Sequence, residues 1–427
     1  MSRPGVEILS RAEPLPRTAP TDTGPWFVAG DAGTAPSVPT LVRSLTDYVN
    51  KFGPRTGGTI LYDAAETYFR EGGTLLWVVT PTMTALTLDA PVDDLEAQTR
   101  SELDAKATDL GLDPASYATK ADVIDGIRAA EAAAPRAAST PAALVTALDL
   151  FTADYGPGQV SVPGVTTPTD QSGILAHAAN HNRVALLDAA DGDATALAAQ
   201  GATLRADTNA RYGALFAPSA IIPGVAGGTS RTVGYSAVQA GIIARNDATL
   251  NPNQAAAGEW GQAVYAQDLF ERYTDDEYET LNEAGVNMSR LIYAGVRTYG
   301  YRSLVDPAGA SGQWRDFGWC RLNMAIVAQA EVIGQRYVFS QIDGRWRTIS
   351  AFGGDLRAML VPFYEADALF GATPEEAFQV IVDERVNTPT TIANGELHAV
   401  MQVRMSPMAE WVVIEIVKVS TLQALAA

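Results

Sequence analysis

Short apolar runs alternate with segments of helical periodicity along the first part of the chain. Residues 26–29 and 75–79 are almost wholly apolar, which predicts two buried strands. Between them, LTDYVNKFG and TILYDAAETYFREGG carry apolar residues at helical spacing. Helices that alternate with strands in this way indicate an α/β layer.

The same alternation resumes at residue 139 and continues to about residue 245. PAALVTALDLF predicts a helix, GQVSVPGV a strand, and GILAHAANHNRVALLDAADG a helix that leads into a strand over 184–187. Another helix and strand follow in ATLRADTNARYGALFAP. Asn, Pro and Gly then accumulate in NDATLNPNQAAAGEWG, which predicts a loop.

The last third of the sequence is less regular. Alternating and helical patterns occur there, but they are separated by longer polar stretches. The predicted elements are strands in VNMSRLIYAGVRTYGYRSL, helices over 316–335 and 351–369, a capped turn at Thr373, Pro374 and Glu376, and strands over 379–383 and 397–405.

Residues 93–138 differ from their surroundings because they are rich in Ala and charge. Apolar residues mark two helix faces, and Thr119 with Asp122 predicts the N-terminal cap of the second helix. The stretch LGLDPASYATKADVIDGI resembles helix-extension-helix modules of the SAP and LEM type, some of which bind nucleic acid. Residues 96–138 hold five Lys and Arg against eight Asp and Glu, and 5 − 8 = −3 opposes phosphate binding. We therefore expect an exposed decoration.

The two ends of the chain predict strands without a domain of their own. Residues 411–419 read WVVIEIVKV and have hardly any polar face, so another strand or layer has to cover them. Residues 1–20 carry four prolines around one apolar alternation at 6–9, which favours an extended arm.

Composition narrows the class of protein. The 427 residues are 47% hydrophobic and 19% charged, enough for two or three folded domains. Thirty Lys and Arg against 49 Asp and Glu give 30 − 49 = −19, which disfavours nucleic acid and anionic membranes as partners. Cys320 is the one cysteine, and neither a signal peptide nor a membrane-spanning run is recognisable. We expect folding in a bacterial-type cytosol.

Candidate metal and catalytic residues are few. His177 and His181 have the spacing of two zinc ligands on a helix, but Ala178 replaces the Glu of the metalloprotease motif and His398 is the only other histidine. Two helix-surface histidines are the favoured interpretation. Cys320 lies on an apolar helix face, where free cysteine acts as a small buried hydrophobe.

Other candidate motifs lack residues that their chemistry requires. The glycine-rich IIPGVAGGTSRTVGYS lacks the Lys of a phosphate-binding loop and predicts a plain surface loop, and no G-x-S-x-G occurs. The acidic run at Asp275, Asp276, Glu277 and Glu279 is typical of a solvated face. We therefore expect no catalytic residues, no cofactor and no metal.

The order of segments outside the insert resembles the tail sheath proteins of contractile phages and phage tail-like particles. The similarity covers about 1–80 and 139–427, and the C-terminal part matches most closely. The matching segments are RPGVEI, LVRSLTDYVNKFG, AAETYFREGGTLLWVV, HNRVALLDAADG, SAVQAGIIARNDATLNPNQAAAGEWG, WRDFGWCRLNMAIVAQAEVIGQRYVF and GATPEEAFQVIVDERVNTPTTIANGELHAVMQVRMSPMAEWVVIEI.

This resemblance implies a structural subunit of a virion tail or tail-like particle, assembled in the bacterial host cytoplasm. Copies of the chain would stack as hexameric rings around a tail tube protein, with baseplate and tail terminator proteins at the ends. Contraction would drive the tube through a cell envelope, and in a phage would lead to genome ejection. The terminal strands would be lent to neighbouring subunits, and they comprise Val6, Glu7, Ile8, Leu9, Trp411, Val412, Val413, Ile414, Glu415, Ile416, Val417, Lys418 and Val419.

The expected fold is therefore α/β (α+β) with several domains. The layout is an N-terminal arm (1–20), an outward-facing α/β domain (21–92 and 139–260), the insert (93–138), an inward-facing C-terminal core (261–409) and a C-terminal arm (410–427). Two alternatives stay open: another self-assembling tube or shell protein, and an α/β hydrolase-like enzyme whose site the sequence does not reveal.

Overall fold

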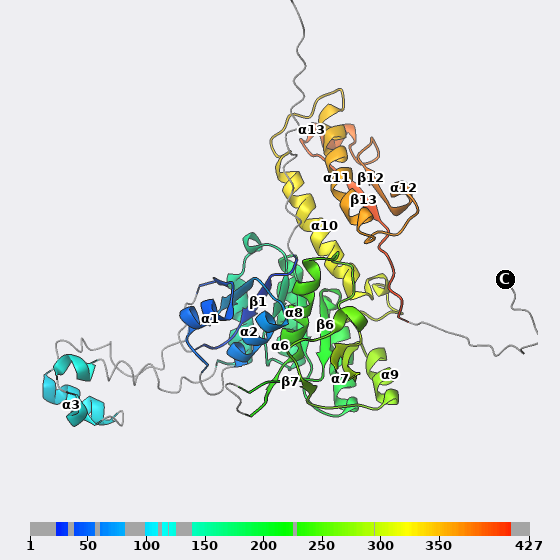
Figure 1. The fold of residues 1–427 in the computed structure, drawn as a ribbon. Coiled ribbons are helices and arrows are strands. Elements are labelled where there is room, and N and C mark those ends of the chain that lie inside the picture. The colour runs from blue at the N-terminus through cyan, green and yellow to red at the C-terminus, as the bar shows by residue number, and fades with distance from the viewer. Residues whose placement is uncertain are drawn as a thin grey trace, which may run out of the picture. The chain divides into compact units, whose positions relative to one another are not determined.

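The computed structural model describes residues 23–32, 38–55, 60–81, 99–109, 113–117, 119–124, 139–224, 229–293 and 295–410. The chain divides into two compact units, Met1–Gln341 and Ile342–Ala427 (Figure 1). The predicted strands at 6–9 and 411–419 lie outside the described residues, so both stay predictions.

An eight-stranded sheet forms the centre of the N-terminal unit. Its six inner strands are parallel, and an antiparallel strand closes each edge. The strand order is β11 (Gly295–Thr298), β10 (Val286–Ile292), β6 (Gly213–Ala217), β5 (Val184–Asp188), β4 (Gln159–Ser161), β1 (Trp26–Ala29), β3 (Leu76–Val79) and β2 (Thr40–Val42). The expected α/β layer is confirmed.

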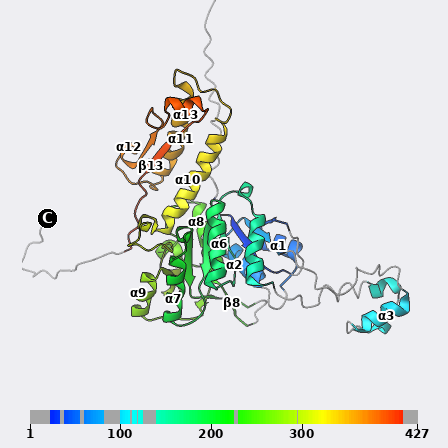
Figure 2. The same cartoon turned by 180° about the vertical axis from the view of Figure 1, so that it is seen from behind.

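Helices cover both faces of this sheet (Figures 1 and 2). One layer is built from α5, α6, α7 and α9, and α2 packs against α8 in the other. The helix bounds are α1 (Leu45–Phe52), α2 (Ile60–Glu71), α5 (Pro141–Ala147), α6 (Pro168–Asn180), α7 (Ala194–Arg205), α8 (Tyr235–Asp247), α9 (Asp275–Glu283) and α10 (Phe317–Gln335). Short 3-10 turns lie at Leu148–Leu150, Ala153–Tyr155, Ala210–Tyr212, Gly258–Gly261 and Gly312–Trp314.

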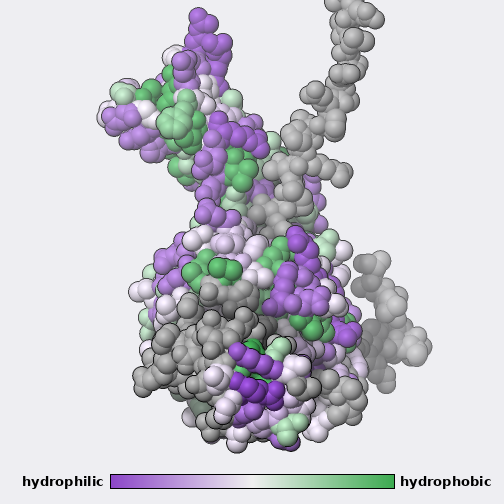
Figure 3. All heavy atoms as spheres, turned by 90° about the vertical axis from the view of Figure 1, so that its left-hand side faces the viewer, coloured by the Kyte–Doolittle hydropathy of each residue, from purple (hydrophilic) through white to green (hydrophobic). Residues whose placement is uncertain are grey.

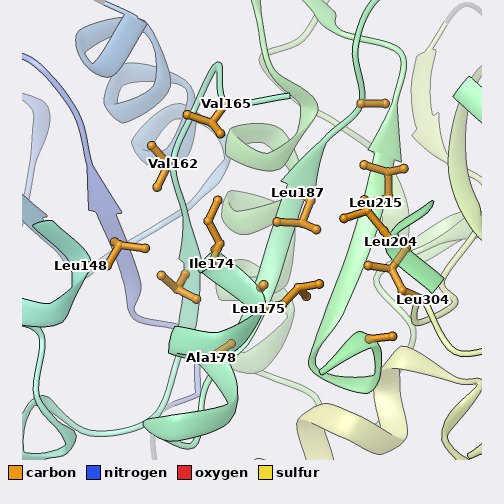
Figure 4. Packing of buried hydrophobic residues seen from close by; sticks show 14 of the residues in the cluster. Leu148, Val162, Val165, Ile174, Leu175, Ala178, Leu187, Leu204, Leu215 and Leu304 are labelled. Carbon is orange, nitrogen blue, oxygen red and sulfur yellow. The ribbon is translucent and has the colours of Figure 1, made fainter. Parts of the chain in front are cut away.

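Burial on both faces explains why the inner strands read as continuous apolar runs. All five residues of β5 are buried, as are all five of β6. Figure 4 shows Ile174 and Leu175 of α6 pointing toward Leu187 and Leu215 on these strands. The continuous apolar pattern that predicted a strand therefore results from burial by helices on both faces of the sheet.

The N-terminal unit also contains a small three-stranded sheet, and its strands show that one expectation from the sequence was wrong. It consists of β7 (Ala220–Ile222), β8 (Arg231–Val233) and β9 (Asp268–Leu269), all antiparallel. The glycine-rich segment expected to be a plain surface loop contributes both β7 and β8, and residues 225–228 between them are not described. Three-residue strands are too short to show a clear alternation.

The described part of the insert has the predicted two helices. Helix α3 (Arg100–Asp109) is followed by a 3-10 turn at Pro114–Ser116 and a helical stretch over 120–124. Its own small core holds Leu103, Ala107, Val123 and Ile124. Thr119 caps the second helix, because its Oγ1 accepts from Asp122 N at 3.2 Å while Asp122 Oδ2 accepts from Thr119 N at 2.8 Å.

The C-terminal unit is built on a long helix and a two-stranded antiparallel sheet. Its elements are α11 (Arg347–Glu365), α12 (Pro374–Ala377), β12 (Phe378–Ile381), α13 (Pro389–Ala393) and β13 (Val400–Val403). Helix α11 starts four residues before the predicted 351, because Asp343 binds the main-chain N–H groups of Arg345 and Thr348 and starts the turn early.

The compact units divide at 341, not at the expected boundary of 260. Strand β10 pairs in parallel with β6, with Val286 opposite Leu215, so residues beyond 260 complete the main sheet. Such pairing between strands far apart in the chain leaves no local signal in the sequence, and the expected domain bounds stay a prediction.

Candidate assembly surfaces

The two-stranded sheet of the C-terminal unit has unpaired edges. Strand β12 pairs only with β13 among the described residues, with Phe378 opposite Val403 and Ile381 opposite Val400. Helix α11 supports one face, where Val382 packs against Gly353. Two strands alone make a marginal sheet, and an open edge presents a row of main-chain donors and acceptors.

A groove of about 300 Å³ runs along the outer side of β12. Its wall combines apolar and polar groups from α11 and from the strand. The lining residues are Trp346, Ile349, Ser350, Gln379, Val380, Ile381, Val382, Asp383 and Arg385. Arg385 binds Asp383, with Nη2 to Oδ2 at 2.7 Å, and so borders the groove with an ion pair. A main-chain edge beside a groove that can take side chains is the arrangement that accepts an added strand.

The expected position on the helix surface is wrong for His177 of α6, which belongs to a buried network, while His181 follows the helix as its half-buried C-terminal cap. The side chain of His177 is 4% exposed and its ring stacks on His181, with ring centroids 4.4 Å apart. Arg183 Nη1 lies 2.9 Å from His177 Nε2 and donates to it. Burial, with the positive charge of Arg183, lowers the pKa of His177 to about 3. The imidazole is therefore neutral. Among the described residues no group of three or more His, Cys, Asp or Glu side chains is placed to hold a metal ion.

Arg183 connects this histidine to the main chain of residues 151–156. Its guanidinium donates to the carbonyl oxygens of Phe151 at 2.6 Å, Thr152 at 2.9 Å and Gly156 at 3.2 Å. It also lies 4.0 Å from the ring centroid of Phe27. Burial lowers the pKa of Arg183 to about 10, so it stays charged at neutral pH. These hydrogen bonds hold residues 151–156 in place. In the sequence, the segment HNRVALLDAADG was the only indication of this site.

Asp188 lies in the same segment, at the carboxyl end of β5. The carboxylate accepts from Ser236 N at 2.7 Å and Ser236 Oγ at 3.0 Å, and more weakly from Gly164 N at 3.4 Å. Burial raises the pKa of Asp188. In α/β sheets this edge commonly holds ligands, but here Asp188 binds the start of α8. Its role in this structure is to join β5 to α8.

Cys320 and the acidic run behave as predicted. Cys320 is a buried free thiol on α10, and burial raises its pKa to about 12, so it stays protonated. The run at 275–279 forms the exposed first turns of α9, where Thr274 and Glu277 make a capping box.

A buried ion pair that sequence reasoning missed joins α8 to α10. Arg321 Nη2 binds Asp247 Oδ2, and the two side chains are 1% and 7% exposed. Thr23 Oγ1 donates to the same Asp247 oxygen at 2.7 Å, and Arg321 Nη1 donates to Pro252 O at 3.1 Å. Through this pair, Thr23 is linked to α8, and α10 is linked to the segment at Pro252.

A second missed residue, Glu71, holds the loop after the 3-10 turn at Gly258–Gly261. Its fully buried carboxylate accepts from three consecutive main-chain N–H groups, those of Val264, Tyr265 and Ala266, at 2.8 to 3.0 Å. Arg245 lies on the other side of the carboxylate at 3.4 Å. No spacing rule connects residues 71 and 264, so the sequence gives no signal for this contact.

Comparison with solved structures finds likeness along the whole chain. A chain of the anti-feeding prophage (AFP) baseplate in the contracted state aligns with a TM-score of 0.65 at 18% identity, over 98% of each chain. A chain of the PVC sheath complex of an extracellular contractile injection system, also contracted, gives 0.64 at 16% identity over 98% of each. The contracted AFP helical sheath gives 0.63 at 19%, covering 98% of this chain and 99% of the other. The chain has the fold of contractile sheath proteins.

At these identities the sheath fold is visible in structure and hardly in sequence. No protein-family model matches the chain, and no curated protein matches it. Within the described residues of this sheath fold, no helix combines the length and the apolar character that crossing a membrane requires.

Proposed function

We propose that this protein is a structural subunit of a contractile tail sheath and has no enzymatic activity. The observation that carries the proposal is the alignment of 98% of the chain with nearly the whole of chains from contracted sheath complexes. In this proposal copies stack as rings of six into a helical tube around a tail tube protein.

The open sheet of the C-terminal unit supports a specific mode of linkage. Strands 6–9 and 411–419 would each add to a free edge of the β12–β13 pair in a neighbouring copy. An added strand forms many main-chain hydrogen bonds at once and places alternate side chains in the groove at Trp346. Such links hold neighbours together while the bodies of the subunits rotate. An interface that does not close on itself then yields an open helix.

The partners and location follow from this proposal. The tube protein would lie inside the sheath, with baseplate and tail terminator proteins at its ends, in a phage tail or a tail-like particle made in the host cytoplasm. Domain orientation remains as expected from the sequence, with the α/β domain and insert outward and the C-terminal core inward. Contraction would release a kinetically trapped lattice, so no nucleotide is needed.

Negative-stain electron microscopy of the purified protein at high concentration tests the proposal. We expect striated tubes or ring stacks from the full chain and none from a variant that lacks residues 411–427. A variant lacking 93–138 is the matched control, because it loses more residues but keeps both terminal strands. Discrete particles from the full chain, with or without added tube protein, would contradict the proposal and favour the enzyme alternative.

A further inference from the structure

The outer edge of β13 in the C-terminal unit is open for an added strand. Arg404 N donates to Ala377 O at 2.8 Å and Phe370 N donates to Arg404 O at 2.8 Å, so the main chain of Arg404 points toward β12. Because main-chain groups alternate in direction along a strand, those of Met401 and Val403 point away from β12. Among the described residues no strand pairs with that side of β13.

The two faces of the β12–β13 sheet differ in chemistry. Val382 packs on Gly353 of α11, so Val380, two residues earlier on β12, faces α11 as well. The register then places Met401 and Val403, both half-buried, on the α11 side of β13. The residues of β13 and its extension that alternate with them are exposed on the other face, here called the open face: Val400, Gln402 and Arg404. Figure 3 shows apolar and hydrophilic residues intermixed on the surface of the C-terminal unit, at the top of the view.

Arg404 is a cation on the open face whose main chain is held on the β12 side. In the part of the chain that the structure describes, no ion pair and no side-chain hydrogen bond involves its guanidinium. The carboxylates of the neighbouring segments have other partners: Asp383 binds Arg385 at 2.7 Å, and Glu376 binds Ala372 N at 3.0 Å. The planar fork of Arg404 is therefore available to a carboxylate from another copy.

The C-terminal strand predicted at 411–419 matches this edge in its pattern. Glu415 is its only acidic residue, and Ile414 and Ile416 on either side of it would point to the opposite face. With the two isoleucines on the α11 side, next to the half-buried residues of β13, Glu415 lies on the open face with Arg404. A shift by one residue would reverse the faces and place the carboxylate among apolar side chains.

The N-terminal strand predicted at 6–9 suits the other edge better. It also carries one glutamate, but residues 1–20 hold three Arg against two Glu, and 3 − 2 = +1 is unfavourable beside Arg404. The groove at β12 is bordered by residues 383–385, which contribute two carboxylates and one arginine. Charge therefore favours 6–9 at the β12 edge and 411–419 at the β13 edge.

We propose that Arg404 binds Glu415 of a second copy of this chain and so determines the edge and the register at which the lent strand joins. This inference rests on the proposed function and adds to it the edge of the sheet that receives residues 411–419. An exposed ion pair contributes little to affinity. A slip of two residues would keep the faces of the strand but lose this pair, so its effect is on register.

Two engineered cysteines test the contact. Arg404→Cys with Glu415→Cys should form disulfides between copies on oxidation, because residues opposite each other in paired strands have Cβ atoms about 4.5–5.5 Å apart. The native Cys320 is buried and does not compete. Non-reducing gel electrophoresis should show a ladder of covalent multimers. Arg404→Cys with Ile414→Cys is the matched control, since it places the second thiol on the other face and should give no ladder.

Exchange of the two charges tests the specificity. Arg404→Glu and Glu415→Arg should each raise the protein concentration needed for assembly about fivefold, and the two together should restore the wild-type value. Sedimentation velocity measures assembly, and 0.5 M salt should reduce the effect. Arg357→Glu is the control at an exposed arginine of α11 that forms no ion pair among the described residues, and it should assemble like the wild-type chain.

The outcomes separate this inference from the sheath proposal. Tubes from the wild-type chain without a ladder from the Glu415 pair would overturn the contact while the sheath proposal stands. A ladder from short oligomers that never form tubes would overturn the sheath proposal and support the contact. Disulfides formed only within one copy, equal ladders from the Glu415 and Ile414 pairs, or no recovery in the charge exchange would each overturn the inference. A chain that is monomeric at every concentration and gives no ladder overturns both.

Discussion

Arg183 Nη1 lies 2.9 Å from Nε2 of His177 inside the N-terminal unit, so the cation fixes the histidine as a neutral acceptor. The proton of the imidazole is then on Nδ1, which has no hydrogen-bond partner among the described residues. Protonating Nε2 would break this bond and place a second positive charge against the guanidinium. The pair therefore makes the stability of the unit sensitive to acid.

The first prediction follows from the pKa of His177, which is about 3 in the folded protein against 6.5 in the unfolded chain. Between these values only the unfolded chain takes up the proton. The contribution of His177 to the free energy of unfolding should therefore be constant above pH 6.5 and fall below it by up to about 1.4 kcal/mol per pH unit.

Urea unfolding between pH 4 and pH 7.5 measures this slope. His177→Gln should flatten it, because a Gln amide oxygen accepts from Arg183 without titrating. His398→Gln is the control at an exposed histidine and should keep the wild-type slope. Equal slopes for all three proteins would show that His177 does not contribute.

The second prediction concerns the buried pair Arg321 and Asp247. Arg321→Met leaves the carboxylate of Asp247 buried without its cation, which should lower the free energy of unfolding by about 3–5 kcal/mol. Replacing both residues, as Arg321→Met with Asp247→Leu, should restore much of that loss because no charge remains buried. Denaturant unfolding of these two variants and of the single variant Asp247→Leu gives the coupling energy. A single variant that loses less than about 1 kcal/mol would be inconsistent with the pair's burial.

The third prediction concerns Glu71 and the loop it binds. Glu71→Gln keeps the size of the side chain but loses the charge that three N–H groups share, so amide exchange over 264–266 should speed up markedly. Hydrogen exchange with mass spectrometry reads this directly. Glu66→Gln on the same helix is the control, since Glu66 binds Arg231 instead. Unchanged protection in Glu71→Gln would mean that the loop is held by other contacts.

The fourth prediction tests the groove beside β12. Ser350 lines the groove and is exposed, so Ser350→Arg should fill it and prevent tube formation while the unit stays folded. The neighbouring Ala351 is exposed on the same helix but does not line the groove, and Ala351→Arg should assemble normally. Electron microscopy of both variants gives the result. Tubes from Ser350→Arg would exclude the groove as the site of an added strand.

The fifth prediction concerns the insert. Deleting residues 93–138 should leave assembly intact and change the free energy of unfolding of the remaining chain by less than about 1 kcal/mol, because the insert has a core of its own. The deletion should keep Ser139, whose N and Oγ donate to Asp31 at 2.8 and 2.6 Å. Loss of tubes from this variant would assign the insert a role in assembly.

The sequence predicted those parts of the fold that have local causes. Strands such as β5 are apolar because helices cover both of their faces, and the capping box at Thr119 and Asp122 is visible within four residues. The hairpin of β7 and β8 was missed because its strands are three residues long and lie in a glycine-rich segment.

The candidate site was less predictable, for a physical reason. The groove combines residues near 346 with residues near 380, so it exists only after the chain has folded. Burial of His177 likewise depends on Arg183 reaching the carbonyl groups of another loop. The predicted strands at 6–9 and 411–419 stay predictions.

The hydrogen bonds between Asp31 and Ser139 have a practical consequence. The chain leaves the main sheet after β3 and returns at Ser139, which Asp31 holds just beyond the end of β1. Adjacent strands lie about 5 Å apart, so the departure and return points are close together. A foreign domain with neighbouring termini could be grafted here in place of residues 93–138. Every copy in a polymer would then display that domain at a fixed repeat, as a multivalent scaffold.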